Sequence, residues 1–123
     1  MLSTSDVIAF VATTKPEQAR AFYERVLGLS LLADEPFALV FDVNGVMLRV
    51  AKVQTLDPAP HTVLSWSVLD IRATIEVLTR KGVVLERYGA LPQDQMGVWT
   101  SPSGARVAWF KDPDGNALSL TQF

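Results

Sequence analysis

Apolar and polar positions along the chain follow one order of predicted elements, and this order occurs twice. The first half predicts a strand, a helix and three further strands, at residues 7–11, 14–28, 29–33, 37–43 and 46–50. Thr14 and Glu17 have the spacing of a helix capping box, and Gly28 is a typical helix stop. Asn44-Gly45 is a strong signal for a two-residue hairpin turn. The first half is therefore predicted to be a β-α-β-β-β unit.

The second half repeats this order after a proline-containing linker at 53–61. Strand, helix and strand patterns follow at residues 63–68, 70–82, 83–85, 106–111 and 117–121. Asp70 is the expected N-cap of the helix, and Ile71, Ile75 and Leu78 form its apolar stripe. Type I turns are expected at 101–104 and 112–115, because each has proline second and glycine fourth. The fold class is therefore predicted to be α+β, with two β-α-β-β-β units.

Alternation along the strands predicts which side chains share a face of each sheet. In the first unit the core face is expected to carry Phe37, Leu39, Phe41, Val46, Leu48 and Val50. The opposite face is expected to carry Ala38, Val40, Asp42, Met47 and Arg49. In the second unit, the same alternation places Trp66 and Trp109 on the helix-facing side. Both tryptophans are therefore expected in the core.

Composition excludes several classes of function. The chain has 123 residues and a formal net charge of −2, which is too acidic for a typical nucleic-acid-binding surface. It has no apolar segment approaching the 20 or so residues that cross a bilayer, and no basic segment typical of a secretory signal. It has no cysteine and a single histidine, His61, which excludes disulfides, thiolate catalysis and cysteine-based metal sites. A cytoplasmic location is expected, without membrane or nucleic-acid partners.

Two stretches, AFYERVLGL at 21–29 and FKDPDGNALSLTQF at 110–123, resemble the signature segments of the vicinal oxygen chelate superfamily. This group includes glyoxalase I, bleomycin-resistance proteins, fosfomycin-resistance enzymes and extradiol dioxygenases. The resemblance implies one domain over 1–123, with a first module at about 5–52, a linker at about 53–61 and a second module at about 62–123. It also implies a curved mixed sheet around a cleft, commonly in a dimer.

Metal-dependent members of that superfamily place their ligands on the first and last strands of a module. The resemblance maps these positions onto Ile8 and Arg49 in the first module, and onto Val63 and Ser119 in the second. Two of these side chains lack a ligand atom, the guanidinium repels cations, and a lone serine hydroxyl is a poor ligand. We therefore expect no metal and no cofactor.

The same resemblance implies that the non-core sheet faces line a cleft. This wall would be mostly apolar, with a few hydroxyl groups and one guanidinium, which suits a small organic ligand. The predicted ligand-binding residues are Phe10, Val40, Met47, Arg49, Ser65, Ser67 and Ser119. Arg49 could bind an anionic ligand or form an ion pair with Asp42 or another carboxylate. No catalytic residues are predicted, although Glu86 and Asp94 are conceivable bases.

These observations leave three functions open. The first is metal-independent binding of a small amphipathic or anionic molecule, as in bleomycin-resistance proteins. The second is a lyase or isomerase with glyoxalase-like chemistry, and the third is a non-catalytic interaction module. A homodimer is expected in each case, because unpaired sheet edges and many apolar residues need to be covered.

Overall fold

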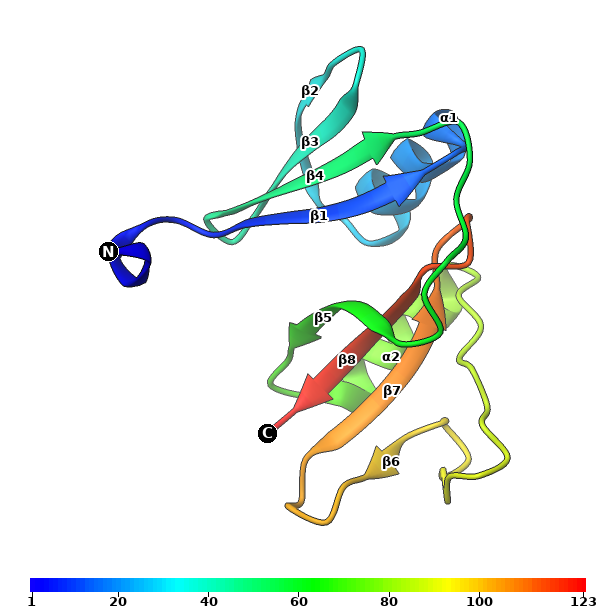
Figure 1. Ribbon diagram of the computed structural model, residues 1–123. Coiled ribbons are helices and arrows are strands. Elements are labelled where there is room, and N and C mark those ends of the chain that lie inside the picture. The colour runs from blue at the N-terminus through cyan, green and yellow to red at the C-terminus, as the bar shows by residue number, and fades with distance from the viewer. The chain divides into compact units, whose positions relative to one another are not determined.

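Each half of the chain forms a four-stranded mixed sheet that is accompanied by a helix (Figure 1). The computed structural model describes residues 1–123 and divides into two compact units, Met1–Asp57 and Pro58–Phe123. None of the helices has the length and apolar character needed to span a membrane.

The first unit begins with a short 3-10 turn, η1 (Leu2–Thr4), ahead of the first sheet strand. Its sheet strands are β1 (Ile8–Thr13), β2 (Ser30–Asp34), β3 (Ala38–Val43) and β4 (Val46–Lys52). Its helix is α1 (Pro16–Ala21), which continues as the π-helical segment η2 (Phe22–Val26). The strand order is β1-β4-β3-β2, in which β1 runs parallel to β4 and the other pairs are antiparallel. The predicted order of elements is therefore confirmed for this half.

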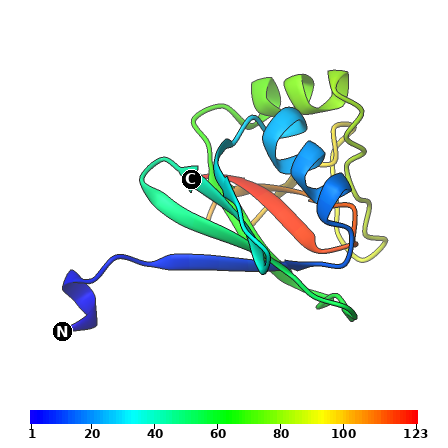
Figure 2. The same ribbon diagram turned by 90° about the horizontal axis from the view of Figure 1, so that it is seen from above.

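The second unit repeats this topology. It contains β5 (Thr62–Ser67), α2 (Ile71–Arg80), β6 (Trp99–Thr100), β7 (Arg106–Lys111) and β8 (Ala117–Gln122). The strand order is β5-β8-β7-β6, and β5 runs parallel to β8 as β1 does to β4. Figure 2 shows the strands and helices from a second direction. The predicted α+β class with two β-α-β-β-β units is thus confirmed.

The segment that follows α2 differs from the prediction. A strand was expected at 83–85, but residues 83–88 have no regular structure, and the strand in this place is the two-residue β6. The backbone N–H of Glu86 donates to the carbonyl of Trp109 at 2.8 Å, so the segment touches the edge of β7 without forming a ladder. Hydrogen bonds between the side chain of Gln93 and the backbone of Glu86 and Tyr88 hold it instead.

The two helices begin differently. Asp70 caps α2 as predicted, since its carboxylate accepts a hydrogen bond from the N–H of Ala73 at 3.1 Å. The N-cap of α1 is Lys15, one residue after the predicted Thr14, and no side chain caps it. The hydroxyl of Thr13 accepts from the N–H of Lys15 at 3.0 Å. The helix therefore begins one residue later than the predicted capping box requires.

Both types of predicted turn are present. Asn44 and Gly45 have φ values of 50° and 88°, which is the left-handed backbone that the hairpin turn requires. The carboxylate of Asp42 accepts from the N–H of Gly45 at 3.2 Å, which further stabilises this turn. The turns at 101–104 and 112–115 are each closed by a hydrogen bond from the glycine N–H to the first carbonyl.

Most of the buried side chains of each unit lie on the predicted core face of its sheet, but Phe37 and Val46 in the first unit and Trp109 in the second do not belong to these cores. In the first unit Leu39, Phe41, Leu48 and Val50 are buried, and the ring of Tyr23 lies 6.0 Å from that of Phe41. Phe37 and Val46 are 81% and 41% exposed, so their assignment to the core is wrong. Phe37 precedes β3, and Val46 lies beside the hairpin turn, where the sheet is open to solvent. In the second unit Phe110, Leu118, Leu120 and the α2 stripe are buried.

Candidate functional site

One row of side chains crosses the first sheet on the face opposite its core. Phe10 on β1 lies beside Arg49 on β4, and Arg49 lies beside Val40 on β3. Paired residues on neighbouring strands point to the same face of a sheet. The pairs one position before and one position after this row contain the buried core residues, so the row itself lies on the opposite face. Phe10 is 61% exposed and Val40 is 4% exposed. On this face, the side chain of Phe10 is therefore exposed, the guanidinium of Arg49 is half-buried and Val40 is buried.

Arg49 has a carboxylate partner, but this partner is Glu35 rather than Asp42. Its Nη2 lies 3.7 Å from Oε1 of Glu35, and its Nη1 lies 4.0 Å from the sulfur of Met47. Asp42 is instead used by the hairpin turn. The pair with Glu35 is long and half-exposed, so its contribution to stability is small. A guanidinium has five N–H donors, and this arrangement leaves it able to contact a further acceptor.

The equivalent row of the second sheet carries two serines and a tryptophan. Ser65 on β5 pairs with Ser119 on β8, and Ser119 pairs with Trp109 on β7. These residues occupy the places that Phe10, Arg49 and Val40 occupy in the first sheet. The predicted equivalence of positions 49 and 119 is thus visible in the strand pairing.

The hydroxyl groups on this face form a small cluster. The hydroxyl of Ser119, which is 3% exposed, donates to the hydroxyl of Ser65 at 2.7 Å. The hydroxyl of Ser65 in turn donates to the carbonyl of Ser119 at 3.1 Å and lies 3.3 Å from the hydroxyl of Thr121. Ser67 is exposed and pairs with Thr121. Ser65, Ser67 and Ser119 therefore share one sheet face, with the first two accessible at its surface.

Three aromatic side chains adjoin the hydroxyl cluster, and the sequence did not indicate this. Trp109 lies 6.1 Å from Trp99 and 5.4 Å from Tyr88, measured between ring centroids. Its Nε1 donates to the hydroxyl of Thr62 at 3.1 Å. Because Trp109 pairs with Ser119, its ring lies on the hydroxyl face and not on the face covered by α2.

The prediction that Trp109 packs on the helix side is therefore wrong, whereas that for Trp66 is confirmed. Trp66 stacks on the buried Phe110, with centroids 6.4 Å apart. Ala108 and Phe110, the neighbours of Trp109 in β7, are both buried, so alternation turns Trp109 to the other side. The sequence contains no signal for this, because residues 107–110 are all apolar and do not alternate with polar residues.

The residues present do not fit the metal centre of metal-dependent superfamily members. The positions onto which the resemblance maps the ligands carry Ile8, Val63, Arg49 and Ser119, and the serine hydroxyl is bonded to a second hydroxyl. No three His, Cys, Asp or Glu residues come together as a possible metal cluster. Divalent cations need several carboxylate or imidazole donors, which this arrangement does not supply.

The two conceivable bases are engaged in structural contacts. Glu86 pairs with Lys111 at 3.5 Å. The carboxylate of Asp94 accepts from the N–H groups of Met96 and Val98 and pairs with Arg72. Partial burial raises the pKa of Asp94, but these hydrogen bonds and the Arg72 charge outweigh it, so the pKa lies below its ordinary value. A carboxylate stabilised in this way is a weak base.

Solved structures with the same fold include enzymes and binding proteins. A superfamily member from Sphaerobacter thermophilus superposes with a TM-score of 0.76 over 100% of both chains at 22% identity. Lactoylglutathione lyase from Agrobacterium tumefaciens superposes at 0.73, over 96% of this chain and 93% of that one, with 16% identity. TnmS3, an antibiotic binding protein from Streptomyces, superposes at 0.69 over 97% of both chains with 25% identity.

Matches to the sequence differ between curated proteins and protein families. No curated protein matches it significantly. The family model described as Glyoxalase/Bleomycin resistance protein/Dioxygenase superfamily matches residues 5–120, which is nearly the whole chain. The chain therefore belongs to the glyoxalase/bleomycin resistance protein/dioxygenase superfamily.

Proposed function

We propose that this protein binds a small amphipathic or anionic organic molecule, without a metal, through the non-core faces of its sheets. The observation that carries the proposal is Arg49, a half-buried guanidinium beside the exposed ring of Phe10 and the thioether of Met47. An apolar surface with one cation can take up the hydrophobic body of a ligand and its charged group together.

The corresponding face of the second unit supports the same function. Its hydroxyl groups can donate or accept hydrogen bonds, and the adjoining rings of Trp109, Trp99 and Tyr88 offer a large apolar surface. TnmS3, which has this fold, is described as an antibiotic binding protein, a ligand class that is also organic and small. Neither face has carboxylates or imidazoles arranged for metal-dependent chemistry.

A thermal-shift screen with small aromatic and aliphatic carboxylates, run in the presence of EDTA, tests the proposal. Ligands that bind the native state raise the unfolding temperature by mass action. The key variant is Arg49→Leu, and Arg106→Leu is the matched control, because Arg106 is exposed and has no carboxylate partner. A lost charge-assisted hydrogen bond of about 1.5–3 kcal/mol corresponds to an affinity loss of about tenfold to a hundredfold.

The proposal requires that carboxylates stabilise the wild type and the Arg106 variant but stabilise the Arg49 variant much less. Equal stabilisation of all three proteins by the carboxylates would show that Arg49 does not take part in binding. Stabilisation that appears only when a divalent metal replaces EDTA would favour the lyase or isomerase alternative. If the Arg49 variant without ligand unfolds at a lower temperature than the wild type, but the ligands raise both temperatures equally, Arg49 would have only a structural role in its pair with Glu35.

We also propose that the protein forms a homodimer. The strand orders leave β1, β2, β5 and β6 at sheet edges. Val7, Ile8 and Phe10, in and before the edge strand β1, are exposed apolar residues, and such an edge is commonly covered by a partner. Light scattering is expected to give about twice the chain mass of 13.5 kDa; a concentration-independent mass near 13.5 kDa would contradict the dimer. The cytoplasmic location stays a prediction.

A further inference from the structure

We infer that the second unit carries an additional ligand site on its helix side, which takes a small amphipathic anion. The site is a groove of about 680 Å³ between α2, the segment 83–87 and residues Gln95 and Met96, referred to here as the α2 groove. This volume lies within the usual range of small-molecule sites. The groove belongs to one unit only and is separate from the hydroxyl face, because α2 covers the other side of the sheet.

The walls of the α2 groove are mainly apolar. Ile75 and Thr79 contribute from α2, and Val83, Val84 and Leu85 contribute from the irregular segment. Val84 is 75% exposed, although a valine side chain normally gains from burial. A ligand with an apolar body would cover this side chain and remove its surface from water.

The charge at the groove favours an anion. Arg87 donates to the carbonyl oxygens of Asp94 and Gln95 at 2.6 Å and 2.5 Å, and no carboxylate forms an ion pair with it. Arg80 has only a long, exposed pair with Glu76, at 3.8 Å. Two guanidinium groups and one carboxylate therefore line the groove, which leaves a positive charge for a carboxylate or sulfonate of the ligand to neutralise.

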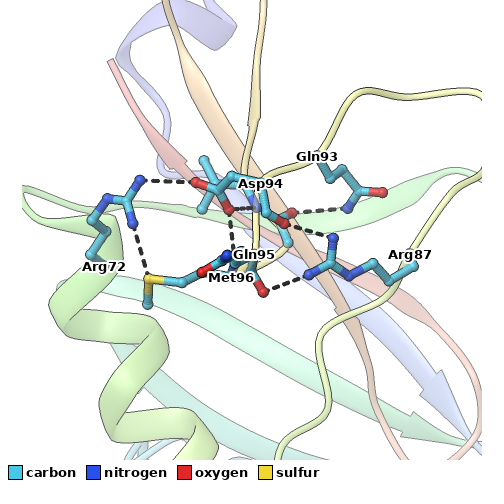
Figure 3. A network of polar contacts seen from close by, with 8 residues as sticks. Arg72, Arg87, Gln93, Asp94, Gln95 and Met96 are labelled. Atoms are coloured by element: carbon cyan, nitrogen blue, oxygen red, sulfur yellow. Dashed lines mark hydrogen bonds and ion pairs between the residues drawn. The ribbon is translucent and has the colours of Figure 1, made fainter.

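The loop at residues 93–97, which forms one wall of the α2 groove, is held in place by a network of polar contacts (Figure 3). Arg72 from α2 contacts the carboxylate of Asp94 at 2.9 Å and the sulfur of Met96 at 3.2 Å. The other carboxylate oxygen of Asp94 accepts from the N–H groups of Met96 and Val98. The amide of Gln93 bonds to the backbone on both sides of the loop, at Glu86, at Tyr88 and at Gly97.

Gly97 lets this loop approach the groove segment closely. Its φ is +87°, and a Cβ at this position would lie 3.3 Å from Cβ of Leu85. The network and this contact fix Gln95 and Met96 beside the groove before any ligand binds. A preformed wall lowers the entropic cost of binding, which favours a specific ligand site over a flexible surface.

Fluorescence titration with anilinonaphthalene sulfonate, a small amphipathic anion, tests the inference on the full chain. Val84→Glu and Val84→Lys form a charge-reversed pair at one exposed position, where neither change disturbs the core. We expect the lysine variant to bind the probe at least as tightly as the wild type and the glutamate variant at least about fivefold more weakly. Arg87→Gln is expected to weaken binding as well, and the control Arg106→Gln is expected to leave it unchanged.

The neutral probe phenylnaphthylamine, which has the same apolar body without the sulfonate, separates charge from hydrophobicity. Its affinity is expected to be similar for both Val84 variants. Urea midpoints equal to that of the wild type would show that these variants are folded. The inference is overturned if the two Val84 variants bind the sulfonate equally. It is also overturned if Arg49→Leu, on the other unit, abolishes the fluorescence signal while the Val84 variants do not change it.

Discussion

Removing the carboxylate of Asp94 should destabilise the second unit, because this group accepts three hydrogen bonds that hold the loop at 94–98 and join it to α2. One oxygen accepts from the N–H groups of Met96 and Val98 at 2.9 Å and 3.0 Å. The other oxygen accepts from Arg72 on α2 at 2.9 Å. In Asp94→Ala both backbone donors lose their acceptor, and the loop loses its link to the helix.

The magnitude follows from these contacts. Each backbone hydrogen bond contributes about 0.5–1.5 kcal/mol, and a half-exposed ion pair contributes about 0.2–1 kcal/mol. Asp94→Ala should therefore lower the free energy of unfolding by about 1–4 kcal/mol. Asp94→Asn keeps a side-chain oxygen for the two N–H groups and loses only the charge, so its loss should be about 1 kcal/mol or less.

Urea denaturation followed by tryptophan fluorescence measures this loss in the correct part of the chain, since all three tryptophans lie in the second unit. Glu76→Gln is the matched control, because it removes one exposed ion pair without touching the loop. Equal losses for Asp94→Ala and Asp94→Asn would refute the assignment of most of the stability to the backbone hydrogen bonds. No loss in either variant would refute the role of Asp94 altogether.

Three further predictions concern local structure. Asp70→Ala removes the acceptor for the N–H of Ala73 and should cost about 1 kcal/mol in urea denaturation, whereas an unchanged midpoint would show that the cap is unimportant. Gly45→Ala places a Cβ at φ +88° and should also cost about 1 kcal/mol; a stabilised variant would contradict this. The hydrogen bond from Lys52 lowers the pKa of the Asp34 carboxyl from its ordinary value of 3.8. The ionised carboxylate therefore stabilises the folded state fully above that pH, and this stabilisation is lost as the pH falls through the lower pKa of the folded state. Acid titration of Asp34→Asn should lack this loss.

Much of the fold could be predicted because its signals are local. Asp70 caps its helix from the side chain, and Asn44-Gly45 has the backbone preferences of one turn type. The failures also have local causes. Thr14 has the right spacing for a capping box, but Thr13 bonds to the N–H of Lys15 and the helix begins one residue later. The expected strand at 83–85 is absent because side chains, and not a strand ladder, hold that segment.

The candidate site could be predicted only in part, because its contacts join residues that are distant in sequence. Alternation placed Val40 and Arg49 on one face, and the resemblance to the superfamily added Phe10; the strand pairing puts Phe10 beside Arg49 and Arg49 beside Val40. The pairing of Arg49 with Glu35 depends on the path of the chain between β2 and β3, which alternation does not describe. The aromatic cluster around Trp109 depends on the segment before β6, for which no regular pattern exists.

Amide chemical-shift mapping tests the central claim of metal-independent binding most directly. The probe is the carboxylate that gives the largest thermal shift, titrated into the isotopically labelled protein with EDTA present. The account predicts saturable shifts at Phe10, Arg49 and their neighbours on β1 and β4, with Arg49→Leu weakening the binding about tenfold or more. Shifts that leave the sheet faces unaffected, or binding that requires an added divalent metal, would contradict it.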